Sequence, residues 1–140
     1  MQQFLVQGRN FPHNACCENC LILPNLFHQS AFLYDVFPQS SAIIKTGVCI
    51  ELPPNTVGFL KSKSGLNVKH SLTTEGVIDE GYTGEIVVKV YNNSNDLYTF
   101  YRGDKITQLV VLPCLYESIE IVDEIEGKER GNNGFGSTGK

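Results

Sequence analysis

The chain has 140 residues, 41% of them hydrophobic and 19% charged, so we expect one globular domain with its own core. Eleven basic against fifteen acidic residues give a net charge of -4, which argues against a protein that mainly grips nucleic acid. No apolar run approaches the ~18 residues of a membrane span, and no signal peptide is recognisable. We therefore expect no membrane or nucleic-acid partner and a cytoplasmic location, or a nuclear one if the source is a eukaryote or a virus.

Residues 1–40 form an atypical N-terminal segment without a sustained period of 2 or 3.6. Cys16, Cys17 and Cys20, with His13 and His28 nearby, are ligand types that zinc accepts. Their spacing matches none of the well-attested zinc patterns. In a cytosolic protein we expect reduced thiols there rather than a metal site.

Residues 41–126 are rich in β-branched and aromatic residues, interrupted by turn signals at short intervals. The expected strand runs are 43–44, 48–50, 57–60, 86–91, 97–101, 106–112 and 119–122. Ile86, Val88 and Val90 alternate with Lys89 and Tyr91, which places the three apolar residues on one face of a strand. Many short strands without a long amphipathic helix predict an all-β sandwich or barrel.

Residues 127–140 are expected to form a flexible, glycine-rich C-terminal arm. Residues 134–140 fit the G-x-x-x-x-G-K opening of a phosphate-binding loop, but the mechanism needs a strand before the loop and a helix after it. The sequence ends at Lys140, so we reject that interpretation. Two interpretations remain: an anion-binding arm with Ser137, Thr138 and a stacking face on Phe135, or a disordered tail.

Three other segments each allow a structural and a functional interpretation. Residues 76–86 predict a hairpin with its turn at 79–81, where Asp79 is either a turn residue or the holder of a water molecule. Residues 61–66 carry two cations and two hydroxyls, which suit either a phosphate site or a solvated loop. Residues 103–109 predict a turn that leads into a strand, with Gln108 as a polar face residue or a ligand contact.

The four segments together, in this order, resemble one family. KSKSGL, GVIDEGYTGEI, GDKITQL and RGNNGFGSTGK are similar to the second to fifth motifs of the trimeric dUTPases. The resemblance extends from about residue 45 to residue 140. It implies a distorted, jelly-roll-like β-barrel over residues 41–126, a homotrimer with shared active sites, and an arm that closes over the substrate. The implied reaction is the hydrolysis of dUTP to dUMP and pyrophosphate.

The resemblance also implies roles for single residues. Asp79 would activate the water that attacks the α-phosphorus, and Tyr82 would pack under the deoxyribose and exclude a 2′-hydroxyl. The backbone of Gly76, Val77 and Ile78 would read the edge of uracil. The residues implied for the phosphates and for the arm over the nucleotide are Lys63, Ser64, Gly65, Gln108, Arg130, Phe135, Gly136, Ser137 and Thr138. Mg²⁺ is the implied cofactor, coordinated by the three phosphates.

The sequence departs from the family pattern at two places. Lys63 stands where the family usually has arginine, which keeps the charge but loses the planar fork. The first motif has only an irregular counterpart in residues 31–36, where Asp35 would help to hold Mg²⁺ through water. The irregular motif leaves a second hypothesis open: a dUTPase-like nucleotide-binding or regulatory protein without efficient turnover. A third hypothesis, dCTP deaminase, is disfavoured by the turn sequence GVIDEGYTG, which suits uracil.

Overall fold

This computed structural model describes residues 5–7, 15–17, 20–24 and 33–127, and every structural statement below concerns these residues. Their elements are β1 (Leu5–Gln7), β2 (Ala15–Cys17), β3 (Cys20–Pro24), β4 (Leu33–Val36), β5 (Ser40–Glu51), β6 (Thr56–Lys61), α1 (Ser64–His70), β7 (Leu72–Ile78), β8 (Glu85–Asn92), β9 (Tyr98–Tyr101) and β10 (Lys105–Pro113). The all-β class that the sequence predicts is confirmed, since α1 is a single helix of seven residues.

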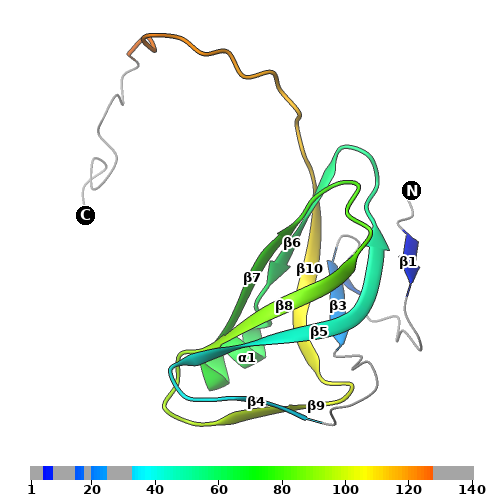
Figure 1. The fold of residues 1–140 in the computed structure, drawn as a ribbon, viewed down its shortest axis with the longest axis vertical. Helices are drawn as coiled ribbons and strands as arrows, with labels where there is room; N and C mark the ends of the chain where they lie inside the picture. The colour runs from blue at the N-terminus through cyan, green and yellow to red at the C-terminus, as the bar shows by residue number, and fades with distance from the viewer. Residues whose placement is uncertain (1–4, 8–14, 18–19, 25–32, 128–140) are drawn as a thin grey trace.

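Eight strands form one sheet in the order β1-β5-β8-β7-β6-β10-β3-β2, and β4 pairs with β9 in a separate two-stranded ribbon. The large sheet curls into a half-barrel, with α1 and the β4–β9 ribbon at its lower end in Figure 1. Strands from the first 24 residues occupy both edges of the sheet: β1 pairs with the end of β5, and β3 pairs with β10. The boundary expected between residues 40 and 41 therefore falls just after Ser40, the first residue of β5, and the large sheet contains strands from both sides of it.

The core lies on one face of the curled sheet, because apolar side chains alternate along its strands. On β8, Ile86, Val88 and Val90 are fully buried, as the alternation predicts. Phe100 of β9 is buried as well. The other buried apolar residues are Val36, Ile44, Val48, Ile50, Leu52, Leu60, Leu72, Ile78, Ile106, Leu109 and Val111. These residues give the chain one core, which the ribbon and the large sheet share.

Six of the seven expected strand runs lie within or across β5, β6, β8, β9 and β10, and the seventh is wrong. Residues 119–122 form no strand, and Ile119 and Ile121 are 93% and 96% exposed. After β10 the chain runs away from the barrel (Figure 1), so this segment has no partner strand among the described residues. The interpretation of residues 61–66 as a loop is also corrected, because α1 begins at Ser64. Within the described chain, no helix has the length and apolarity that a membrane crossing requires.

Candidate functional site

The described site residues fall into two groups at opposite ends of β7. The first, the helix-end group, lies where β6 leads into α1 and where β10 begins its course; its members are Lys63, Ser64, Gly65 and Gln108. The second, the turn group, lies where β7 ends and the chain turns toward β8; its members are Gly76, Val77, Ile78, Asp79 and Tyr82. Figure 1 shows α1 at the lower end of β7 and the turn at its upper end.

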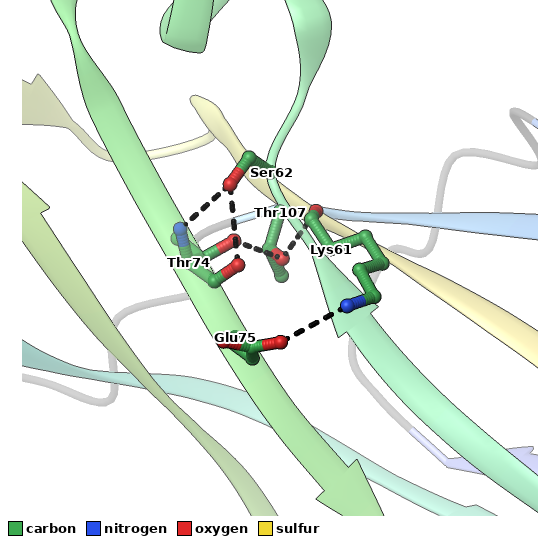
Figure 2. Close-up of polar contacts among 5 residues, drawn as sticks. All are labelled: Lys61, Ser62, Thr74, Glu75 and Thr107. Carbon is green, nitrogen blue, oxygen red and sulfur yellow. Dashed lines mark hydrogen bonds and ion pairs between the residues drawn. The ribbon is translucent and has the colours of Figure 1, made fainter. Parts of the chain in front are cut away.

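A chain of hydrogen bonds beneath the helix-end group joins three strands (Figure 2). The Thr107 hydroxyl donates to the carbonyl of Lys61 at 3.0 Å and lies 2.8 Å from the Thr74 hydroxyl. Because Thr107 has one hydroxyl proton, Thr74 is the donor in the bond between the two threonines. Ser62 Oγ accepts from the backbone N–H of Thr74 at 2.9 Å and donates to its carbonyl at 3.2 Å.

Because two of its hydroxyl groups are buried, this chain of hydrogen bonds is important for folding stability. Thr107 is 0% and Thr74 is 5% exposed, so a hydroxyl that lost its partner would stay desolvated and unpaired. By contrast, Lys61 Nζ and Glu75 Oε1 form an exposed ion pair at 3.1 Å, which we expect to contribute little. The buried bonds fix residues 61 and 62 and thereby set where α1 starts.

The start of α1 presents polar groups to solvent. Lys63 is the N-cap, in an extended conformation, and no side chain caps the helix. Ser64 and Gly65 are exposed, and no residue of α1 is buried. Gln108 Nε2 donates to the carbonyl of Ser62 at 3.4 Å, so it lies beside this segment. The structure thus brings Gln108 next to Ser62, the residue just before the N-cap of α1.

The turn group begins where β7 changes partner. β7 pairs with β8 only at Leu72–Thr74, and its residues 76–78 pair with β6 instead. The edge of residues 76–78 that would face β8 therefore carries no ladder to that strand. This open edge leaves backbone donors and acceptors available to a flat polar ligand.

The turn itself is short and exposed. The N–H of Tyr82 donates to the carbonyl of Asp79 at 3.1 Å, and Gly81 has a φ of 84°, which favours glycine. Asp79 is exposed, so water can reach its carboxylate. Tyr82 is 45% exposed, and its hydroxyl donates to the carbonyl of Glu85 at 2.9 Å. The expected turn at 79–81 is confirmed, and β8 begins at Glu85, one residue before the expected strand run of 86–91.

Glu80, for which no role is predicted from the sequence, connects this turn to two other segments. Its Oε2 accepts from the N–H of Asn55 at 2.9 Å, and the carbonyl of Asn55 accepts from the N–H of Cys114 at 2.8 Å. Glu80 also accepts from the Tyr116 hydroxyl, and this hydrogen bond is the main reason that the pKa of Tyr116 is raised. No sequence signal marks Glu80, because its partners are distant in the chain.

Asp79 of the turn group lies well away from the hydrogen-bonded chain beneath the helix-end group. Thr74 belongs to the hydrogen-bonded chain beneath the helix-end group, and it is four residue steps from Ile78, the last residue of β7. At about 3.3 Å per residue this distance is roughly 13 Å, and Asp79 lies beyond it. Each group therefore carries only part of the chemistry that the sequence predicts.

Asp35, the expected outer ligand of Mg²⁺, lies in β4. Its Oδ1 accepts from the Thr99 hydroxyl of β9 at 2.6 Å. Among the described residues, no group of three or more His, Cys, Asp or Glu side chains is placed to hold a metal ion. His13 and His28 lie outside the described residues, and the side chains of Cys16, Cys17 and Cys20 are not described either. The expectation for these cysteines stays a prediction.

The predicted residues of the arm are Arg130, Phe135, Gly136, Ser137 and Thr138. All five lie outside the described residues, so their roles also stay predictions.

Comparison with known proteins assigns the chain to a family. The family model for dUTPase matches residues 29–139. The deoxyuridine 5′-triphosphate nucleotidohydrolase of Gloeothece citriformis is 39% identical over 133 residues, which are 87% of this chain and 92% of that protein. The enzyme of the same name from Clostridioides difficile is 40% identical over 129 residues, with coverage of 84% and 90%.

Solved structures agree with these matches. A mutant dUTPase of Staphylococcus bacteriophage 80alpha, with dUpNHpp, is 27% identical and superposes with a TM-score of 0.81 over the whole of both chains. A mutant dUTPase from phage phi11 of S. aureus, solved to show the coordination of a structural Mg(II) ion, is 26% identical with a TM-score of 0.71, and the match covers 88% of this chain and 98% of that one. The chain belongs to the dUTPase family.

Proposed function

We propose that this protein hydrolyses dUTP to dUMP and pyrophosphate in a homotrimer whose sites are shared between subunits. One observation carries the proposal: the motifs of one family lie in two incomplete groups at opposite ends of β7. A symmetric trimer brings the helix-end group of one subunit to the turn group of another without any change within the chain. The nucleotide then bridges the two groups, with its base at the turn group and its phosphates at the helix-end group.

The open edge of β7 supports selection of the base. Residues 76–78 pair with β6 on one side only, so the backbone groups of the other side are free to meet a polar edge. Cytosine presents a donor where uracil presents an acceptor, so a backbone N–H aimed at that position would be left unpaired. A site that loses a buried hydrogen bond in this way discriminates strongly against the wrong ligand.

Asp79 supports the chemical step. Its carboxylate is exposed at the turn and close to the open edge, where it can orient a water molecule and take its proton. The water oxygen forms a bond to the α-phosphorus. The bond from the α-phosphorus to the bridging oxygen breaks, and pyrophosphate leaves. Tyr82 packs under the deoxyribose, where a 2′-hydroxyl finds no room.

The helix-end group supports binding of the phosphates. Lys63 supplies a positive charge, while Ser64 and Gly65 offer a hydroxyl and uncapped backbone N–H groups at the start of α1. Gln108 holds the phosphate chain or its water. Arg130, Phe135, Gly136, Ser137 and Thr138 complete the site from the arm, which closes over the nucleotide and excludes bulk water.

Mg²⁺ fits this site if the phosphates of the substrate, rather than a cluster of protein side chains, bind the ion. The described residues offer no cluster of carboxylates, whereas Mg²⁺ keeps several waters and is commonly held through phosphates. Asp35 is the residue that would hold the ion through water. When bound, the ion neutralises charge on the triphosphate. The location, cytoplasmic or nuclear, stays a prediction.

The hydrogen bond of Asp35 supports a second candidate function. Its carboxylate oxygen already accepts a hydrogen bond from Thr99, and it lies in the irregular first motif. If this engagement keeps Asp35 from the ion, the protein binds dUTP without efficient turnover and acts as a nucleotide-binding or regulatory protein.

Pyrophosphate release with Mg²⁺ tests both functions, with dUTP, dCTP, dTTP and UTP as parallel substrates. We expect selective cleavage of dUTP, and a loss of roughly 10²- to 10⁴-fold in kcat for Asp79→Asn with dUTP binding retained. Asp96→Asn is the matched control, because Asp96 is exposed in another turn. Binding of dUTP without cleavage by the wild type would favour the second function, and ammonia release from dCTP would contradict both.

A further inference from the structure

Gly84 lies between the turn and β8, and the ring of Tyr82 fills the space where its side chain would be. A Cβ atom built on Gly84 would lie 2.7 Å from Tyr82 Oη and 2.8 Å from Tyr82 Cζ. Real Cβ atoms essentially never come within 3.0 Å of a heavy atom outside their own residue and its chain neighbours. Any side chain at this position must therefore displace the tyrosine ring.

Packing, and not backbone conformation, is what requires glycine here. The described glycines with positive φ are Gly47, Gly81 and Gly103, and Gly84 is not among them. Alanine can thus adopt the backbone conformation of Gly84 without strain. The atoms in its way belong to the far end of a side chain that can rotate, so the substitution should move the ring rather than unfold the loop.

The ring position is anchored to a rigid part of the sheet. The Tyr82 hydroxyl donates to the carbonyl of Glu85, the first residue of β8. Glu85 Oε1 in turn accepts from the N–H of Gly47 at 2.8 Å. This second bond crosses to the irregular stretch of β5 between residues 45 and 49, where the strand register shifts.

A buried hydrogen bond fixes the next residue of β8 as well. The Thr46 hydroxyl donates to the carbonyl of Ile86 at 2.7 Å, and both Thr46 and Ile86 are fully buried. The start of β8 is therefore held by β5 from within the core. The carbonyl that receives the Tyr82 hydroxyl is a fixed point, and the ring is held between it and Gly84.

We propose that Gly84 is a specificity-determining residue, which sets the sugar selectivity of the site by leaving room for the Tyr82 ring. The proposal rests on the proposed function, in which the exposed face of this ring meets the deoxyribose. With Gly84, the ring lies close to the backbone and presents a fixed surface that has no space for a 2′-hydroxyl. With a larger residue, the ring loses its bond to Glu85 and swings away, so a ribose can enter.

The test compares kcat/KM for dUTP and UTP in the wild type and in Gly84→Ala. We expect the dUTP-to-UTP ratio to fall by roughly tenfold, mainly because UTP becomes a better substrate. Tyr82→Phe keeps the ring and removes its anchoring hydroxyl, so it should lower the ratio by a smaller factor. Thr83→Ala, an exposed neighbour in the same loop, is the control and should leave the ratio unchanged.

The outcomes separate this inference from the proposed function. A wild type that cleaves no dUTP overturns the proposed function, and with it the inference. A different result would overturn the inference alone: the wild type prefers dUTP to UTP, and both Gly84→Ala and Tyr82→Phe show the same preference. Calorimetric affinities for dUMP and UMP provide a readout without turnover: the preference for dUMP should weaken in Gly84→Ala.

Discussion

The two ends of β7 are built by different physical means. At the lower end, Thr74 and Thr107 are buried and hydrogen-bonded to each other, and Ser62 joins them to the segment before α1. At the upper end, the turn is held by exposed bonds, from Asn55 to Glu80 and from Tyr82 to Glu85. Buried hydroxyls cost stability when a partner is lost, whereas exposed groups can bond to water instead.

This difference predicts different consequences of substitution at the two ends. Changes beneath the helix-end group should appear mainly as lost folding stability. Changes around the turn should leave stability almost intact and appear in turnover. Substitutions at Thr107 and at Glu80 test this difference between the two ends.

Thr107→Val should lower the free energy of unfolding by about 1–3 kcal/mol, because it leaves the buried Thr74 hydroxyl without its acceptor and removes the hydrogen bond to the Lys61 carbonyl. Denaturant unfolding at equal protein concentrations measures this loss. Thr107→Ser keeps the hydroxyl and should recover part of the stability. Thr73→Val, next to Thr74 on β7, is the matched control, since Thr73 takes no part in this buried chain of hydrogen bonds and is only half-buried.

If Thr107→Val and Thr73→Val lost equal amounts of unfolding free energy, the result would contradict the claim that buried hydrogen bonds stabilise the lower end of β7.

Glu80→Gln should change the free energy of unfolding by no more than about 0.5 kcal/mol, because Glu80 is exposed. It should nevertheless lower kcat for dUTP a few-fold, since it weakens the bonds that hold the residue next to Asp79. It should also lower the pKa of Tyr116 toward its ordinary value, because the hydrogen bond to Glu80 is the main cause of the raised pKa. Steady-state kinetics and a spectrophotometric titration of the tyrosines measure these two effects.

Tyr116→Phe identifies the Tyr116 signal in that titration. In the wild type, the bond to Glu80 is present while the phenol is protonated, and it is lost as the pH rises through the raised pKa of Tyr116. Glu117→Gln is the control, because Glu117 is an exposed carboxylate next to Tyr116 in the chain. A large loss of stability in Glu80→Gln with unchanged kcat would reverse the proposed distinction between the two ends.

Much of the strand content could be predicted from the sequence, because alternation and turn residues are local signals. Gly103 shows this clearly: it has a φ of 92°, and β10 begins two residues later, as the turn in residues 103–109 predicts. Residues 119–122 have the same β-branched composition but no partner strand within the described chain. α1 gave no helical signal, since it has seven residues and none is buried.

The site residues could be named from the sequence, but not their arrangement. Asp79 and Gln108 belong to motifs that are recognisable when the four are taken together in order, whereas their separation depends on how β7, β6 and β10 pair. The departure of β7 from β8 after Thr74 is a long-range choice of partner, and no local pattern marks it. The same holds for Gly84, whose importance depends on where the Tyr82 ring lies.

The central claim is that one active site combines the turn group of one subunit with the helix-end group of another. Co-expression of two inactive variants tests it most directly: Asp79→Asn, and a Ser64→Ala/Gln108→Ala double variant. If sites are shared, random mixing restores about a quarter of the wild-type activity, because some sites take an intact turn group and an intact helix-end group from different subunits. Mixed trimers without restored activity would contradict the claim and place each complete site within one chain.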